Sequence, residues 1–577
     1  MNSLILAVLM MVGYFVAYHT YGQFLARKIF KLNPEAVCPS TELQDNHDFV
    51  PTKREILFGH HFTSIAGLGP IVGPAIAIIW GWIPAALWVF FGSIFFGAVH
   101  DFGALVISLR AKGRSIGDLA ADIVNKRVRT LFLLIIFFEL WIVIAVFALI
   151  MAILFTMYPI AVIPVWFEIP IALLLGYLVY KRGKDALLPS IVAVVIMYVT
   201  VVIGGYLPIN FETIFGMNPK LTLITWVIIV LVFDAWLAST LPVQTLLQPR
   251  DFINSHQLLI AMAMLTLGVI VAHPPIVAPA TNFAAEGAPP VWPFIFVVIA
   301  CGAISGFHSL VSSGTSSKQC DTESSSLFIG YGSMLMEGVL GTLVIVAVAA
   351  GIGLGLAGKG GEIFTGVDAF NHHYASWAAA EGLASKLGAF IHGSANMIQS
   401  YGIPVKIALA VMAVFIVSFA ATSVDTATRI QRYVIVELSN AYNFKPLSGR
   451  RAATAFAVIT AAALAFYDGS GKGAMKLWPL FGTVNQLLAG LALLVITIYL
   501  AHRKVNILYT ALPMFFMVIM TGWAMILNIQ KFYNTSNWLL LVIGIAVFIL
   551  NIWMIVESVV VLKTTYGRNK VSSEAVN

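Results

Sequence analysis

The sequence predicts an all-α polytopic membrane protein with about 15 transmembrane helices. Of its 577 residues, 60% are hydrophobic and only 10% are charged, and the mean hydropathy is +0.92. A soluble domain is about 25% charged, so this composition excludes a soluble globular enzyme. Apolar runs of roughly 20 residues match the length that a helix needs to cross the hydrocarbon layer. The strands of a membrane barrel would instead alternate apolar and polar residues.

We place fifteen apolar spans along the chain. Their approximate ranges are 3–27, 62–80, 82–109, 131–157, 163–180, 187–206, 222–247, 257–273, 291–313, 327–357, 403–427, 451–467, 477–501, 505–529 and 537–562. With this count, every basic cluster falls on one side, and cytoplasmic connections carry the excess of Lys and Arg. We therefore predict an N-terminus outside the cell and a cytoplasmic C-terminus. The net charge of +7 is then a topology signal and does not indicate nucleic acid binding.

The span at 62–80 is interrupted by glycine and proline. Pro70 and Pro74 lack a backbone N–H and glycine is a weak helix former, so a regular helix is disfavoured here. Unwound backbone at membrane depth is tolerated beside protein or a water-filled cavity, and the positive end of the resumed helix suits a substrate carboxylate. Close packing through a GxxxG step is the alternative interpretation. The candidate substrate-binding residues in this region are His60, His61, Gly67, Gly69 and Pro70.

A second interruption is predicted at 238–244, within the span at 222–247. This span lies five spans after the first interrupted one, so the two cross the membrane in opposite directions. Paired broken helices are typical of transporters built from inverted repeats, and we predict an inverted five-plus-five repeat core. Gln244 is a further candidate for substrate contact and Asp234 for ion coupling. The predicted divisions are 1–61 (first span and cytoplasmic connection), 62–206 (repeat one), 222–427 (repeat two) and 451–577 (peripheral C-terminal spans and cytoplasmic tail).

A third segment, 305–317, is polar within an apolar span. The spacing of Gly306, His308 and Gly314 in this segment is the same as that of the three residues Gly59, His61 and Gly67. Hydroxyl groups of Ser312, Ser313 and Thr315 offer oxygen ligands for a coupling cation, and His308 offers a substrate contact. The alternative is that these hydroxyl groups bond back to their own helix.

Charged side chains at membrane depth are costly and are functional candidates by default. They are Asp101, Glu139, Asp234, His308, Glu337, Lys406, Asp425 and Glu557. Asp101 lies about 13 Å inward from Arg110 at 1.5 Å per residue, which favours a role in proton uptake and release; a structural ion pair is the equal alternative. Asp425 is a coupling candidate, although an ion pair with Arg429, four residues on, favours a structural or gating role.

Other motifs fail. The segment 353–360 resembles a P-loop but lacks its Ser or Thr, and the sequence contains neither H-E-x-x-H nor G-x-S-x-G. The histidines and Cys38 do not have zinc-like spacing. We therefore expect no enzymatic activity, no cofactor and no metal site. The sequence does not decide between a proton and a sodium ion as coupling cation, and it does not indicate an oligomeric state.

Several long motifs recur in order between about residues 58 and 490. They are 58–62 (FGHHF), 66–74 (AGLGPIVGP), 248–252 (QPRDF), 305–309 (SGFHS), 312–315 (SSGT), 422–429 (TSVDTATR) and 477–488 (LWPLFGTVNQLL). Together they resemble the carbon starvation protein A (CstA) family of the amino acid–polyamine–organocation transporter superfamily. The resemblance implies an importer of peptides or pyruvate in the plasma (inner) membrane, used when carbon is scarce.

The resemblance also implies an assignment of the core helices. It makes 62–80 the first core helix, 222–247 the sixth and 291–313 the eighth. In sodium-coupled members of that superfamily the first and eighth helices share a cation site, which would fall on Ser312 and Ser313 here.

Our hypothesis from the sequence is a secondary active importer of small carboxylate-bearing solutes, peptides or pyruvate, driven by proton or sodium symport. Its expected partners are the small-molecule substrate and the lipid bilayer. The alternative is a membrane sensor or receptor that binds the solute without net transport. No residue in the sequence separates peptide from pyruvate as the substrate.

Overall fold

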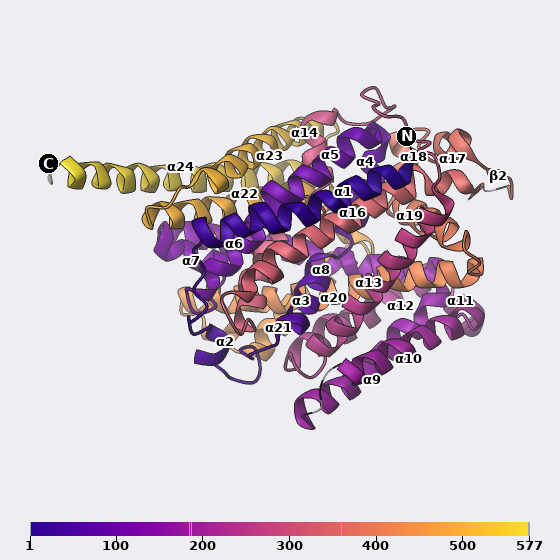
Figure 1. Cartoon of the computed structure of the whole chain (residues 1–577), viewed down its shortest axis with the longest axis horizontal. Helices are drawn as coiled ribbons and strands as arrows, with labels where there is room; N and C mark the ends of the chain where they lie inside the picture. Colours follow the sequence, from indigo (N-terminus) through magenta and orange to yellow (C-terminus); the bar gives the residue numbers. More distant parts are fainter. Residues whose placement is uncertain (1, 184, 186, 359, 575–577) are drawn as a thin grey trace.

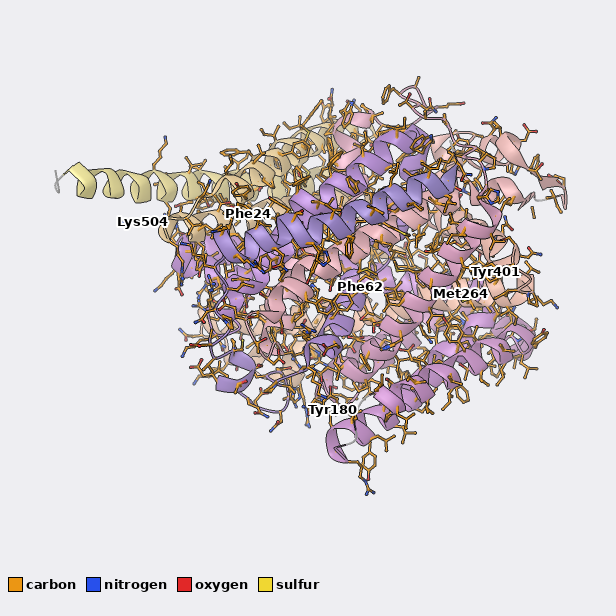
Figure 2. The ribbon with its side chains drawn as sticks, in the orientation of Figure 1. Phe24, Phe62, Tyr180, Met264, Tyr401 and Lys504 are labelled. Atoms are coloured by element: carbon orange, nitrogen blue, oxygen red, sulfur yellow. The ribbon has the colours of Figure 1, made fainter. Side chains whose placement is uncertain are left out.

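The computed structural model describes residues 2–183, 185, 187–358 and 360–574, with side chains to residue 561 and at residue 563. The chain forms a bundle of long helices (Figure 1). Helices α17 and α18 and the N-terminus lie at one end of the bundle, and α2 and α7 lie at the other. Side chains fill the space between the ribbons, with Phe62 buried in the interior and Tyr180 at the end of a peripheral segment (Figure 2).

Twelve helices among the described residues are long and apolar enough to cross a membrane. They are α1–η1–η2 (Ser3–Ile29), α5–η4–α6 (Trp82–Leu109), α8 (Lys126–Met157), η5–α9–η6 (Pro159–Lys181), α10 (Leu187–Tyr206), α12–η7 (Pro219–Ala238), α13 (Leu247–Ala272), η9–α16–η10 (Leu327–Leu354), α20 (Val405–Ala441), α22 (Trp478–His502), α23 (Leu508–Asn534) and α24 (Trp538–Glu574), where η marks a 3₁₀ or π segment. A bent pair of helices, α3 (Arg54–Ile65) and α4 (Gly69–Ala77), brings the number to thirteen if it is counted as one span.

Shorter elements connect or cap these spans. They are α2 (Pro39–Glu42), α7 (Ile116–Ile123), α11 (Phe211–Phe215), α14 (Val291–Val298), α15 (Gly306–Gly314), α17 (Gly366–His373), α18 (Trp377–Ala380), α19 (Leu383–Gln399), α21 (Arg450–Phe466) and the antiparallel pair β1 (Leu356–Ala357) and β2 (Ile363–Phe364).

The polytopic all-α fold is confirmed, but the count of about fifteen spans is not. Twelve of the fifteen predicted ranges coincide with long helices, and 62–80 falls on the bent pair. The range 291–313 is divided between α14 and α15, and α21 has 17 residues. These two ranges are apolar in sequence, yet neither contains one helix as long as a full span.

The predicted interruption of the span at 62–80 is confirmed. Helix α3 (Arg54–Ile65) ends before residues 66–68, and α4 (Gly69–Ala77) resumes at an angle of 46°. Proline is tolerated in the first turn of a helix, where its missing N–H has no partner to lose, and Pro70 occupies that turn of α4. We refer to residues 66–68 as the first break.

The second predicted interruption is in the wrong place. Residues 239–246, which include Gln244, form the connection between two separate spans, α12–η7 and α13. In this connection the Val243 N–H bonds to the carbonyl of His47. The span at 222–247 is therefore not a broken helix, because the chain turns back where the continuous apolar run suggested that it crosses.

A second broken pair of helices lies later in the chain, where α14 and α15 are separated by residues 299–305, the second break. Helix α14 packs on α4 and α15 packs on α3, so the two broken pairs run antiparallel. An inverted repeat requires this arrangement, although the repeat and its predicted boundaries stay predictions. The breaks are held between α8, α20, α16 and α22, while the hairpin of α9 and α10 lies at the edge of the bundle (Figure 1).

Candidate functional site

The two breaks meet at one cavity of about 260 Å³. Gly69 lines it from the start of α4, and Ala300 and Cys301 line it from the second break. Phe147 of α8 faces it as well. Aromatic and charged residues complete the wall: Phe294, Trp377, Trp478, Phe481, Glu381, Lys386 and Lys531. The cavity therefore lies between the two broken pairs, near the end of the bundle that carries α18.

Glycine allows this close approach. A Cβ atom at Gly69 would collide with Cys301 Sγ, and one at Gly73 would lie 2.5 Å from the backbone oxygen of Val298. Both interpretations of the glycine- and proline-rich segment are therefore compatible with the structure. The glycines bring the broken helices into contact, and the breaks line a cavity.

Behind the cavity lies a group of four fully buried residues that we call the histidine–carboxylate cluster: His100 and Asp101 of α6, His308 of α15 and Glu337 of α16. His100 Nδ1 lies 2.7 Å from Asp101 Oδ1, and His308 Nδ1 lies 3.0 Å from Asp101 Oδ2. On its other side, His308 Nε2 lies 3.3 Å from Glu337 Oε2. The cluster thus forms a continuous chain of groups that can exchange protons.

Cys301 connects this cluster to the cavity. The ligand atoms of Cys301, His308 and Glu337 lie within 4.8 Å of one another, a distance that could accommodate a metal ion. However, His308 and Glu337 already pair directly, and His308 uses its other nitrogen for Asp101. We therefore interpret the group as a chain of paired charged side chains, in which the contact between His308 Nε2 and Glu337 Oε2 is an ion pair and not a hydrogen bond.

A second buried group, the arginine–carboxylate cluster, comprises Asp234, Arg250, Asp425 and Arg429. Arg250 lies 2.9 Å from Asp234 and 3.1 Å from Asp425. Arg429 lies 4.0 Å from Asp425, so the pair expected from the sequence exists but is longer than the pair with Arg250. The two predicted coupling residues Asp234 and Asp425 therefore share one guanidinium group, and neither lines the cavity.

This cluster continues into the connection that precedes α3. Asp48 lies 3.0 Å from Arg432 and 3.5 Å from Arg429. Burial opposes ionisation of Asp48, but its hydrogen bond with His47 and the guanidinium groups of Arg432 and Arg429 outweigh burial and hold the pKa of Asp48 below its usual range.

The predicted substrate-binding histidines lie outside the cavity wall. His60 Nδ1 lies 2.5 Å from Asp251 Oδ2, and His61 Nδ1 lies 2.8 Å from Ser316 Oγ, so these rings connect α3 to its neighbours. His308 lies in the histidine–carboxylate cluster. Of the seven predicted substrate contacts, Gly69 lines the cavity, Gly67 and Pro70 adjoin it within the broken pair, and Gln244 lies in the connection described above.

The predicted hydroxyl ligands mostly bond to their own helix. Ser313 Oγ donates to the carbonyl of Ser309, and Thr315 Oγ1 donates to that of Val311. Ser312 Oγ is buried without a hydrogen-bond partner among the described residues, and so is Ser423 Oγ, which faces Gly67. Ser423 was not among the predicted site residues, although it lies in the motif at 422–429.

Three residues of the site were given no specific role from the sequence. Glu337 was only one of several intramembrane charges, Cys301 gave no signal, and Lys386 lies in a segment interpreted as a connection. That segment contains α19, which packs against α4, α13 and α20. Burial lowers the pKa of Lys386 to about 8. The motif at 477–488, by contrast, already pointed to the cavity wall around Trp478.

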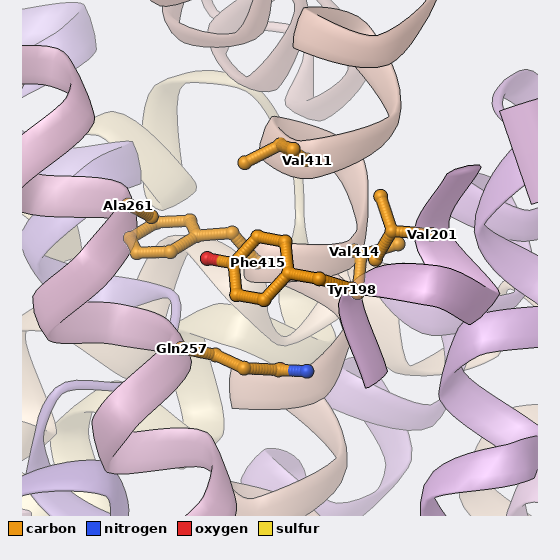
Figure 3. Close-up of a pocket in the computed structure, with 7 residues that line it drawn as sticks. All are labelled: Tyr198, Val201, Gln257, Ala261, Val411, Val414 and Phe415. Atoms are coloured by element: carbon orange, nitrogen blue, oxygen red, sulfur yellow. The ribbon is translucent and has the colours of Figure 1, made fainter. Parts of the chain in front are cut away.

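A second, much smaller gap lies between α10, α13 and α20, with Tyr198, Gln257 and Phe415 around it (Figure 3). The side-chain amide of Gln257 has no hydrogen-bond partner among the described residues. The gap measures about 10 Å³, enough for about one water molecule, and therefore has no room for a solute.

Two antiparallel broken helix pairs enclose a cavity within a bundle of many membrane spans, and one wall of that cavity carries charged and aromatic side chains. This arrangement defines the class of protein, a polytopic membrane transporter. Comparison with known sequences gives the family. The chain belongs to the carbon starvation protein CstA family, whose sequence profile matches residues 2–524. The resemblance found in the sequence motifs is thereby confirmed.

Relatives from several bacteria support this assignment. The chain is 32% identical to the peptide transporter CstA of Campylobacter jejuni, with 93% of this chain and 81% of the relative covered. It is 31% identical to the pyruvate/proton symporter BtsT of Escherichia coli, with 91% and 81% covered. It is 30% identical to the peptide transporter CstA of Bacillus subtilis, with 97% of each chain covered. The chain is a solute transporter of this family.

Proposed function

We propose that this chain imports a small carboxylate-bearing solute, pyruvate or a short peptide, by proton symport across the plasma membrane. The observation that carries the proposal is that both helix breaks line one cavity with a histidine–carboxylate cluster directly behind it. Since one relative is named a pyruvate/proton symporter and others peptide transporters, both substrate classes remain in the proposal.

The cavity wall favours an anion. It carries the ammonium groups of Lys386 and Lys531 against the single carboxylate of Glu381. The N-terminal end of α4 at Gly69 adds the positive end of a helix dipole. Cavities for drug-sized ligands measure about 300–1,000 Å³, so a volume of about 260 Å³ favours a solute as small as pyruvate over an extended peptide.

The buried groups favour a proton over a sodium ion as the coupling cation. Histidine and carboxylate side chains bind and release protons, and the cluster offers a chain of them. Of the predicted hydroxyl ligands, Ser313 Oγ donates to its own helix and accepts from the Ile116 N–H, and Thr315 donates to its own helix. Ser312 Oγ has no hydrogen-bond partner among the described residues, but it does not line the cavity. We retain Asp101 as a member of the proton-coupling cluster and assign Asp234 and Asp425 a structural role. The N-terminus outside and the C-terminus in the cytoplasm remain our proposed orientation.

Uptake by proteoliposomes tests the proposal. Purified protein is reconstituted, and uptake of radiolabelled pyruvate and of a radiolabelled dipeptide is measured under an imposed proton gradient, an imposed sodium gradient, or neither. We expect pyruvate accumulation that requires the proton gradient. Uptake that follows the sodium gradient would contradict proton coupling. Saturable binding without uptake under any gradient would favour the sensor alternative.

A further inference from the structure

Glu337 connects the histidine–carboxylate cluster to the cavity wall through its two oxygen atoms. Oε1 accepts a hydrogen bond of 2.9 Å from the backbone N–H of Gly302, and Oε2 lies 3.3 Å from His308 Nε2. Gly302 follows Ala300 and Cys301, which line the cavity. One carboxyl group therefore contacts both a proton-exchanging side chain and the backbone of the second break.

The conformation of the second break makes this contact specific. Gly302 has φ +88°, a backbone conformation that favours glycine, and it lies 3.6 Å from Pro70 of the other broken pair when measured from its ideal Cβ position. A backbone N–H held in this conformation has a defined direction, and Glu337 Oε1 is its acceptor. A change at Glu337 is thus transmitted directly to the segment where the two broken pairs meet.

We propose that Glu337 carries the symported proton and that its hydrogen bond to Gly302 links proton binding to the shape of the substrate cavity. This inference rests on the proposed proton symport and names the group that performs it. Asp101 is then a positioning residue, since it holds His308 through Nδ1 and leaves Nε2 directed at Glu337.

The proton balance follows from these contacts. In the unloaded cluster His308 lies between the carboxylates of Asp101 and Glu337, and these two negative charges favour an imidazole that is protonated on both nitrogens. One proton that arrives from the cavity then binds the Glu337 carboxylate and reduces the negative charge of the cluster by one. Its release on the other side restores the two carboxylates. The Gly302 N–H then faces an ionised acceptor in one state and a neutral one in the other, and hydrogen bonds to ionised acceptors are stronger.

The surroundings of Glu337 suit this exchange. The titratable groups nearest to Glu337 are His308 and Cys301, with Asp101 and its partner His100 beyond His308. His61 of α3 interacts with Asp101 and His308, and Tyr14 of α1 lies beside Gly338, the next residue in the chain. Among the described residues, Glu337 and Asp101 form ion pairs with histidines. A histidine can lose its charge, so these pairs place no permanent positive charge beside Glu337 that would oppose its protonation. Asp425, by contrast, pairs with arginines.

The test compares Glu337→Gln with the wild type in proteoliposomes. Glutamine keeps an oxygen acceptor for Gly302 but cannot release a proton. We expect at least a tenfold loss of proton-driven pyruvate accumulation, while pyruvate counterflow, which needs no net proton movement, persists. Glu139→Gln is the matched control, because Glu139 is also a fully buried carboxyl but has no hydrogen-bond partner among the described residues. We expect this control to retain both activities.

The outcomes separate the inference from the proposed function. Proton-driven accumulation in Glu337→Gln at the wild-type rate would overturn the inference and leave proton symport intact. If the wild type shows no proton-driven accumulation, both the inference and the proposed proton symport are overturned.

Pyruvate binding to the detergent-purified variants guards against misfolding. Trp377 and Trp478 line the cavity, so their fluorescence reports binding. At pH values below the pKa of about 8 of Lys386, we expect the wild-type affinity for pyruvate to fall as the pH rises and the affinity of Glu337→Gln to be independent of pH. Binding that keeps the wild-type pH dependence would overturn the inference, and so would a loss of binding at every pH, since the variant retains the contact with Gly302.

Discussion

The molecule buries two charged groups that are alike in depth and opposite in chemistry. In the histidine–carboxylate cluster, Asp101 and Glu337 pair with imidazole rings. In the arginine–carboxylate cluster, Asp234 and Asp425 pair with Arg250. Arginine remains protonated in proteins, whereas histidine changes charge near neutral pH. The first cluster can therefore change its charge during a transport cycle, and the second keeps its charge and holds η7, α13 and α20 together.

Burial of a carboxylate at membrane depth is thus insufficient evidence of ion coupling, because the partner decides whether the charge can change. The position of the clusters agrees with this division of roles. The histidine–carboxylate cluster adjoins the cavity through Cys301 and Gly302, while the arginine–carboxylate cluster adjoins the connection that contains Asp48.

Loss of Arg250 should have the largest effect on stability. In Arg250→Ala two carboxylates remain buried without their shared partner, and breaking a buried ion pair in this way costs about 3–5 kcal/mol. We expect a large fall in the melting temperature of the detergent-purified protein. Arg127→Ala is the control, because Arg127 is exposed, and this variant should have the same melting temperature as the wild type. Equal melting temperatures for both variants would show that the arginine–carboxylate cluster does not hold the helices together.

Asp101→Asn should reduce transport more than stability. Asparagine has nearly the same shape, but His308 loses a charged acceptor worth about 1.5–3 kcal/mol, which corresponds to a roughly 10–100-fold loss of proton-driven uptake. Initial rates of pyruvate uptake between about pH 5 and 8, where histidine titrates, measure the effect. The matched variant Asp234→Asn should keep the wild-type pH profile. An unchanged profile in Asp101→Asn would reassign Asp101 to a purely structural role.

Gly73→Ala tests the contact between the two broken pairs. The added methyl group would lie 2.5 Å from the Val298 carbonyl oxygen, and overpacking of this kind costs about 1–3 kcal/mol. We expect slower uptake and a lower melting temperature. Gly388→Ala in α19 is the control, because its Cβ atom would have no neighbour within 4 Å. Similar uptake rates in the two variants would mean that transport does not depend on this contact.

Asp48→Asn should have the smallest effect, about 1 kcal/mol, since Asp48 is partly exposed. The pKa of Asp48 is held below its usual range, so its stabilisation is complete above the unfolded pKa of about 3.9 and is lost only as the pH falls through the folded value. The difference in melting temperature between Asp48→Asn and the wild type should therefore stay constant between about pH 5 and 8. A difference that disappears within that range would contradict the ion pairs with Arg432 and Arg429.

Local signals predicted much of this structure from the sequence. The composition and the apolar runs predicted the polytopic helical fold, and Pro70 and Pro74 predicted the first break, because proline and glycine act within a few residues. The second break carries no proline between residues 299 and 305, and the sequence did not predict it. The repeated glycine and histidine spacing falls on α15, after the break. The segment 238–244, which contains a proline, was interpreted wrongly because a tight connection between two spans and a break within one span favour the same residue types.

The long-range pairings between charged side chains of the site could not be predicted from the sequence. Asp101 lies 207 residues from His308, and Arg250 lies 175 residues from Asp425, so their partners depend on how the helices pack. The intramembrane charges were recognised individually. Which of them face histidine and which face arginine became apparent only in three dimensions, and this distinction separates the two clusters.

Cys301 gives the transporter a native chemical reporter. The chain has three cysteines, and Cys301 lies in the cavity wall at the contact with Gly69, whereas Cys38 and Cys320 pack together elsewhere. A thiol between two broken helices reacts only when the cavity admits the reagent. The rate at which a membrane-impermeant maleimide labels it, applied from one face and then the other, therefore reads out the fraction of time that the site is open to each side.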